Sequence, residues 1–81
     1  MDLYAEWCGP CKQLTPRLEE RVKKMEGVKM VKIDIDKCPQ IASALQVKSV
    51  PTVYLVFQGQ AVDGFNGNVP DAEMDRFFKT I

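Results

Sequence analysis

Two cysteines, Cys8 and Cys11, lie two residues apart in the segment Cys-Gly-Pro-Cys. Pro10 is typical of a first helical turn, so the pair is predicted to lie where a helix begins. Two cysteines at this spacing can close a small disulfide ring, and the helix dipole stabilises a thiolate on the first sulfur. This placement favours Cys8 as the attacking thiol. Cys11 can then attack a mixed disulfide on Cys8 and release the bound partner.

Two other chemistries use the same pair of cysteines, namely half of a zinc site and a structural disulfide. Zinc needs four ligands, whereas the chain has no histidine and Cys38 is its only other cysteine. We therefore expect no metal. The absence of histidine also excludes a Cys-His or Ser-His nucleophile pair. Two interpretations stay open for Cys38. It is either an inert, partly buried thiol or a regulatory thiol that joins two monomers into a dimer.

The composition is that of one small globular domain. The chain has 81 residues, of which 46% are hydrophobic and 27% charged, and its formal net charge is zero. This balance argues against nucleic acid and anionic membrane surfaces as partners, because both need a basic patch. The longest apolar run, 53–57, is too short to span a bilayer. The first residues show no signal-peptide pattern, and the cysteines are few and odd in number. We therefore expect a reducing compartment, namely the cytoplasm, with the mitochondrial matrix as the alternative.

Apolar periodicity and turn residues predict the order strand, helix, strand, helix, strand, strand, helix. The predicted elements are a strand at 2–5, a helix from Pro10 to Gly27, a strand at 31–35, a short helix from Pro39, a buried central strand at 52–57, its hairpin partner at 60–65 and a helix capped by Asn68 that runs to Ile81. This order predicts an α/β fold with one four-stranded mixed sheet and helices on both faces.

Residues 5–12, Ala-Glu-Trp-Cys-Gly-Pro-Cys-Lys, resemble the active-site signature of the thioredoxin family almost letter for letter. The match continues at the family's spacing through Pro16, the Asp-Ile-Asp of 34–36, the Val-Pro-Thr of 50–52 and Gly67, so it covers essentially the whole chain. The family's usual N-terminal strand and helix are missing here. The resemblance therefore implies the thioredoxin-like fold, as a single domain at 1–81 that is truncated at its N-terminus.

The resemblance also implies roles for individual residues. Cys8 is the nucleophile, Cys11 is the resolving cysteine, and the substrate-binding surface is made of Trp7, Gly9, Pro10, Val50, Pro51 and Gly67. In the family the proline matching Pro51 follows a cis peptide bond, and the residue before it offers its backbone to an extended substrate. The alternatives are a core position for Trp7, a strand-start role for Pro51 and a plain loop glycine at Gly67.

Asp2 and Lys32 align with a buried acid beneath the resolving cysteine of the family and with the lysine that pairs with that acid. A buried carboxylate at this place can accept the proton of Cys11 when Cys11 attacks. The alternative is a solvated aspartate at a frayed chain end.

A protein-disulfide reductase is the function that the resemblance implies, with disulfide-containing proteins as substrates and a flavoprotein thioredoxin reductase as electron donor. No nucleotide-binding motif is present, so no cofactor of its own is expected. The Gly-Pro between the cysteines is typical of the family's reducing members. A second interpretation is a protein-binding module, because 13–16 and 62–67 resemble the thioredoxin domain of bacterial co-chaperones that continue into tetratricopeptide helices.

Overall fold

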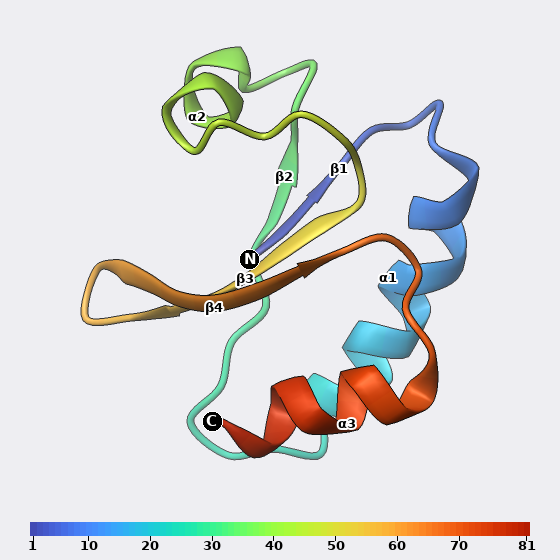
Figure 1. Ribbon diagram of the computed structural model, residues 1–81, viewed down its shortest axis with the longest axis vertical. Coiled ribbons are helices and arrows are strands. Elements are labelled where there is room, and N and C mark those ends of the chain that lie inside the picture. Colours follow the sequence, from blue (N-terminus) through green and yellow to red (C-terminus); the bar gives the residue numbers. More distant parts are fainter.

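The computed structural model describes residues 1–81 and has the predicted order of elements. Along the chain these are β1 (Asp2–Tyr4), α1 (Gly9–Val22), β2 (Lys32–Asp34), α2 (Pro39–Ala44), β3 (Thr52–Phe57), β4 (Gln60–Asn66) and α3 (Asp71–Lys79). The four strands form one mixed sheet in the order β2-β1-β3-β4 (Figure 1). The predicted α/β class and the four-stranded mixed sheet are therefore confirmed.

Strand β1 is short but central. It pairs in parallel with β2 and antiparallel with β3, so that Leu3 lies opposite Ile33 on one side and Thr52 on the other. Leu3 has no exposed surface. Because β1 leads directly into the loop that carries the cysteines, the middle of the sheet holds this loop in place.

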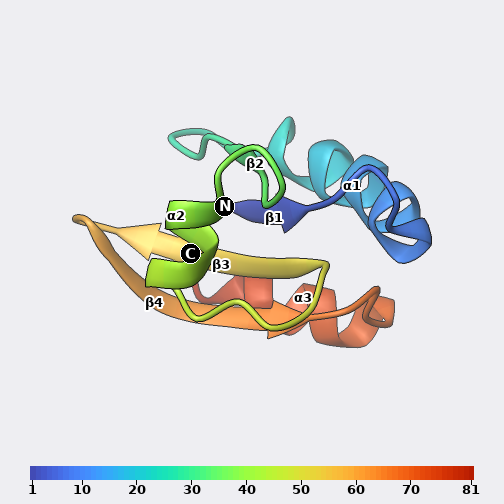
Figure 2. The same ribbon diagram turned by 90° about the horizontal axis from the view of Figure 1, so that it is seen from above.

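Helices cover both faces of the sheet. Helices α1 and α3 lie side by side on one face, and α2 lies on the other side (Figures 1 and 2). Two ion pairs connect α1 to α3, Arg17 to Asp71 at 2.7 Å and Arg21 to Asp75 at 2.6 Å. The main core lies between these helices and the sheet and consists of Leu14, Leu18, Val53, Phe65, Val69, Met74 and Phe77. None of the helices has the length and apolar character needed to cross a bilayer.

Helix α1 ends earlier than the sequence predicts. Its last residue is Val22, and Gly27 lies beyond it with a positive φ of 75°. Between them the backbone forms tighter turns, because the N–H of Lys24 bonds to the carbonyl of Arg21 and that of Met25 to Val22. These hydrogen bonds, each between residues three apart, satisfy the last carbonyls of the helix, and the chain then turns towards β2.

The predicted burial of the strands is only partly right. In β3 the first residues are buried, but Val56 is 42% and Phe57 63% exposed, because the β3–β4 hairpin extends past the helices (Figure 1). Val31 lies before the first residue of β2 and is 51% exposed, whereas Asp34 at the end of β2 is buried. The Asp34 carboxylate accepts the N–H of Asp36 at 2.9 Å, which compensates for its burial at the turn after the strand.

Helix α3 begins at Asp71 rather than directly after Asn68, so the predicted cap is wrong. Pro70 occupies the N-cap position in an extended conformation. The side chain of Asn68 is engaged elsewhere, since it accepts from Arg17 at 2.6 Å and donates to Gln13 at 3.0 Å. Both partners belong to α1, so Asn68 connects the loop before α3 to the helix that carries the cysteines.

Candidate redox site

Cys8 and Cys11 form a disulfide at the N-terminus of α1, with their Cα atoms 5.3 Å apart. Cys8 is the N-cap residue, and its Sγ accepts the backbone N–H of Cys11 at 3.2 Å. Gly9 and Pro10 make the first turn and are exposed. Because the first N–H groups of a helix lack partners within it, this position stabilises negative charge on the Cys8 sulfur.

The disulfide itself is almost entirely covered. Cys8 is 3% and Cys11 2% exposed, and Ala5, Ile35 and Val50 are among the residues packed around them. Only a small part of Cys8 is therefore open to a partner sulfur. Cys38 makes no disulfide, and no cluster of three metal-binding side chains exists in the structure.

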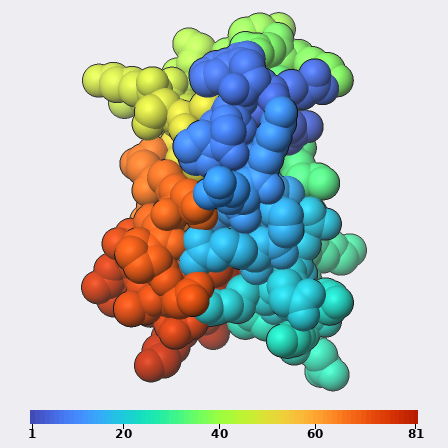
Figure 3. All heavy atoms as spheres, turned by 90° about the vertical axis from the view of Figure 1, so that its right-hand side faces the viewer, coloured from blue at the N-terminus to red at the C-terminus, as the bar shows by residue number.

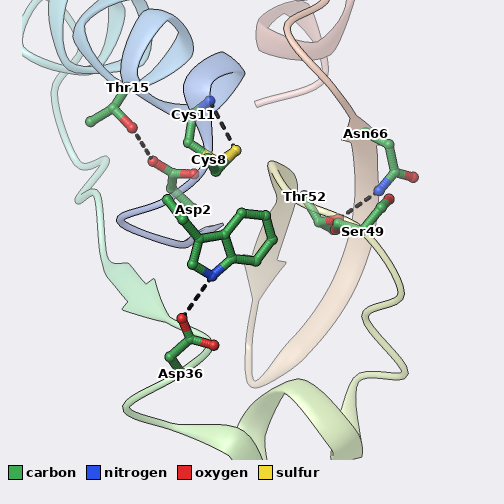
Figure 4. The surroundings of a disulfide bond; sticks show 9 residues. Asp2, Cys8, Cys11, Thr15, Asp36, Ser49, Thr52 and Asn66 are labelled. Carbon is green, nitrogen blue, oxygen red and sulfur yellow. Dashed lines mark hydrogen bonds between the residues drawn. A yellow bond between two sulfur atoms is a disulfide. The ribbon is translucent and has the colours of Figure 1, made fainter.

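Trp7 lies on the surface beside the disulfide and is 69% exposed. The alternative that placed Trp7 in the core is therefore wrong. Its Nε1 donates to Asp36 Oδ2 at 2.9 Å, a bond drawn in Figure 4. This bond connects the cysteine loop to the segment after β2, and it fixes the side of the disulfide on which the indole lies. Asp36 was not among the site residues predicted from the sequence.

The peptide bond between Val50 and Pro51 is cis, as the resemblance implied. Val50 packs against the cysteine pair, and neither its N–H nor its carbonyl makes a hydrogen bond within the chain. In Figure 3 the yellow segment that contains these residues adjoins the blue segment that contains the cysteines. A backbone donor and acceptor thus stay free next to the disulfide, which is what an added extended strand requires.

Gly67 lies next to this free backbone. Its N–H donates to the carbonyl of Pro51 at 2.8 Å, and its φ of 84° lies in the region that favours glycine. A Cβ at this position would meet no atom within 4 Å. The positive φ therefore favours glycine at this position. The absence of a side chain also leaves open space at the edge of the site.

Asp2 is buried beneath α1, with 1% of its surface exposed, so the solvated alternative is wrong. Its Oδ2 accepts the hydroxyl of Thr15 at 2.8 Å, and its Oδ1 is buried without a partner. Burial raises the pKa of Asp2, and the Thr15 hydrogen bond opposes that rise. Cys11 and Thr15 are four residues apart and share a helix face, so Asp2 lies under Cys11 (Figure 4).

Lys32 lies opposite Asp2 in the β1–β2 ladder, but the direct ion pair that the resemblance implied is not formed. The Lys32 side chain is exposed, and its Nζ lies 3.9 Å from Glu19 Oε1 instead. Its charge still acts on Asp2 at longer range and lowers the pKa of that carboxyl. The contact from Thr15 was missed, although its helical spacing from Cys11 was a usable signal.

Known proteins resemble the chain over its full length. The family model described as Thioredoxin matches residues 1–80. A probable thioredoxin-2 of Caenorhabditis elegans is 39% identical, and a mitochondrial thioredoxin of Mus musculus is 43% identical. Each match covers 100% of this chain but 57% and 49% of the respective relative. The chain thus spans about half the length of the first curated relatives that it matches.

Solved structures show the same similarity. Mitochondrial thioredoxin 3 from Saccharomyces cerevisiae, in its oxidized form, superposes with a TM-score of 0.88 at 36% identity, covering 99% of this chain and 74% of the yeast chain. A Plasmodium falciparum thioredoxin gives a TM-score of 0.88 at 30% identity, covering 98% of this chain and 80% of that one.

Proposed function

Because the chain belongs to the thioredoxin family, we propose that this domain reduces disulfide bonds of other proteins through the dithiol form of Cys8 and Cys11. The observation that carries the proposal is the disulfide between these two residues at the N-terminus of α1. Two cysteines that can form a disulfide in the fold can, in their reduced dithiol form, supply the two electrons that a substrate disulfide takes up. The oxidised domain is then the product of one turnover.

The reaction has two exchange steps. The Cys8 thiolate attacks one sulfur of the substrate, the substrate disulfide breaks, and the other substrate sulfur leaves as a thiolate. Cys11 then loses its proton and attacks Cys8 Sγ. The mixed disulfide breaks, the second substrate thiolate leaves, and the Cys8–Cys11 bond forms. The substrate gains two electrons and takes its protons from solvent.

Asp2 is proposed as the base for the second step. It is buried under the helix face that carries Cys11, and its Oδ1 has no other partner. Burial raises the pKa of Asp2 above its ordinary value, which makes the carboxylate a better proton acceptor. Lys32 supports the ionised form through its charge.

The substrate is proposed to bind as an extended segment along Val50, whose backbone N–H and carbonyl are free. Such pairing recognises the main chain and therefore suits many protein substrates. Exposed Trp7 lies beside the disulfide, Gly9 and Pro10 are also exposed, and Gly67 leaves its edge open.

A flavoprotein thioredoxin reductase is proposed to return the oxidised domain to its dithiol form. The relatives include mitochondrial thioredoxins of Mus musculus, Rattus norvegicus and Bos taurus. This favours the mitochondrial matrix over the cytoplasm as the proposed compartment. Oxidation of NADPH by the domain, that reductase and a disulfide substrate together tests the pairing.

Reduction of insulin disulfides with dithiothreitol as the electron source tests the activity itself. We expect the domain to accelerate the reaction, and Cys8→Ser to abolish the acceleration. Reduced Cys11→Ser, mixed with insulin in the absence of dithiothreitol, should accumulate a mixed disulfide with the substrate, visible by mass spectrometry. Cys38→Ser is the matched control and should keep full activity, since Cys38 lies outside the disulfide. A fully active Cys8→Ser variant would contradict the proposal.

A further inference from the structure

Thr15 makes an unusual contact for a threonine within a helix. Such a hydroxyl commonly bonds to the backbone carbonyl one turn earlier. Here the Thr15 hydroxyl donates its hydrogen bond to Asp2 Oδ2 at 2.8 Å. This hydrogen bond connects α1 to the central strand β1. Thr15 is partly buried and lines a surface hollow of about 620 Å³ together with Cys11.

The other oxygen of Asp2 has no partner. Oδ1 is buried, and no donor in the chain reaches it. A buried polar atom without a hydrogen bond is rare in folded proteins because it loses its water without replacement. Figure 4 shows the carboxylate between Thr15 and the cysteine pair, with one oxygen occupied by the threonine. The unoccupied oxygen is therefore available to a proton donor from the cysteine side.

We propose that Thr15 is a positioning residue for the resolving step: its hydroxyl occupies Oδ2 of Asp2 and leaves Oδ1 as the acceptor for the Cys11 proton. The inference rests on the role of Asp2 proposed above. In this step the proton passes from Cys11 Sγ to Oδ1, and Cys11 forms its bond to Cys8. The bond between Cys8 and the substrate breaks, and the substrate sulfur leaves with the electron pair.

Several groups determine how tightly Asp2 holds that proton. Burial is the largest influence and raises the pKa of Asp2, and the Thr15 hydrogen bond opposes it most strongly. The amino group of Met1, which directly precedes β1, and Lys32 on β2 lower the pKa further, whereas Glu19 on α1 raises it. Removing the hydroxyl therefore leaves burial less opposed, and the carboxyl keeps its proton to higher pH.

A pair of substitutions isolates the hydroxyl. Thr15→Val removes it at nearly constant volume, whereas Thr15→Ser keeps it. The first measurement is the titration of the Asp2 carboxyl by carbon NMR in the oxidised domain, which does not depend on activity. We expect the midpoint to rise in Thr15→Val and to return towards the starting value in Thr15→Ser. An unchanged midpoint in Thr15→Val overturns the inference.

The second measurement follows the resolving step directly. Reduced Cys38→Ser domain is mixed with dithiobisnitrobenzoate, and attack by Cys8 and then by Cys11 releases coloured thiolate in two phases. In Thr15→Val we expect the second phase to slow about tenfold at the acid end of its pH profile, the scale of one lost hydrogen bond to a charged group. The first phase should stay unchanged. A slowing that is equal at every pH indicates a structural role only and overturns the inference.

Asp2→Asn separates this inference from the proposed function. If Asp2 is the base, Asp2→Asn slows the second phase more than Thr15→Val does. A second phase that is unaffected by Asp2→Asn refutes the role of Asp2 and with it the inference. A slow Asp2→Asn variant beside an unaffected Thr15→Val variant refutes the role of Thr15 alone.

Discussion

Replacing Asp2 by asparagine should stabilise the folded domain at neutral pH. The substitution removes the charge of a side chain that is 1% exposed and keeps an oxygen that accepts from Thr15. An ionised carboxylate that is buried with one oxygen unpartnered costs about 1–3 kcal/mol more than a neutral group at the same place, and the amide of asparagine is neutral. The expected gain is therefore about 1–3 kcal/mol, against a total stability on the order of 4–12 kcal/mol for a chain of this length.

The sign of the pH dependence follows from the raised pKa of Asp2. Burial raises it above the ordinary value of 3.8, so over the range above that value the folded domain binds more protons than the unfolded chain. Below the ordinary pKa the Asp2 carboxyl is protonated in both the folded and the unfolded state, so the stability of the fold with a neutral Asp2 is fully present. The contribution of Asp2 is lost as the pH rises through the pKa of the folded state. The advantage of Asp2→Asn should thus be small in acid and grow towards neutral pH.

Urea unfolding of the oxidised domain and of Asp2→Asn, followed by circular dichroism from about pH 4 to about pH 8, measures this difference. The other titrating groups are common to both proteins, so the pH slope of the difference reports Asp2. A difference that is constant across the range would refute the reasoning, because it would show that the proton affinity of Asp2 is the same in the folded and unfolded states.

Three further predictions test the packing and the polar contacts of the fold, each by urea unfolding. Leu14→Ala should cost about 2–5 kcal/mol because Leu14 is completely buried in the main core; a cost under about 1 kcal/mol would contradict that packing. Gly64→Ala should cost about 1–3 kcal/mol because its Cβ would lie 2.7 Å from a backbone carbonyl of β3, and an unchanged midpoint would refute the close approach. Arg17→Ala should cost more than Asp71→Ala, since it also removes the donor to the Val69 carbonyl, whereas the ion pair alone gives under about 1 kcal/mol. Equal costs would show that the carbonyl bond adds nothing.

Local spacing in the sequence was enough to predict the chemistry of the site and the order of the elements. Cys8 and Cys11 lie within one helical turn, and Pro10 between them marks the start of that helix. The turn at 58–59 likewise predicts the hairpin of β3 and β4. These features depend on neighbours a few residues apart, so their physical causes are present in the sequence itself.

The ends and exposures of the elements were less predictable. The alternation of apolar residues predicted a strand at 31–35, but β2 covers only Lys32–Asp34 at the edge of the sheet, and Val31 lies before it, half exposed. Asn68 has the chemistry of a helix cap, yet its side chain bonds to Arg17 and Gln13 on α1. At Asn68 a contact from elsewhere in the chain outweighed the local preference.

The amino-acid sequence alone therefore determined which two sulfur atoms take part in disulfide exchange, because both belong to one turn of one helix. Only the tertiary structure decided what surrounds them. Asp2 is buried because a three-residue strand pairs with β2 on one side and β3 on the other, and this pairing joins segments far apart in sequence. The same folding brings Thr15 to Asp2, directs Lys32 to Glu19 and places the free backbone of Val50 beside the cysteines.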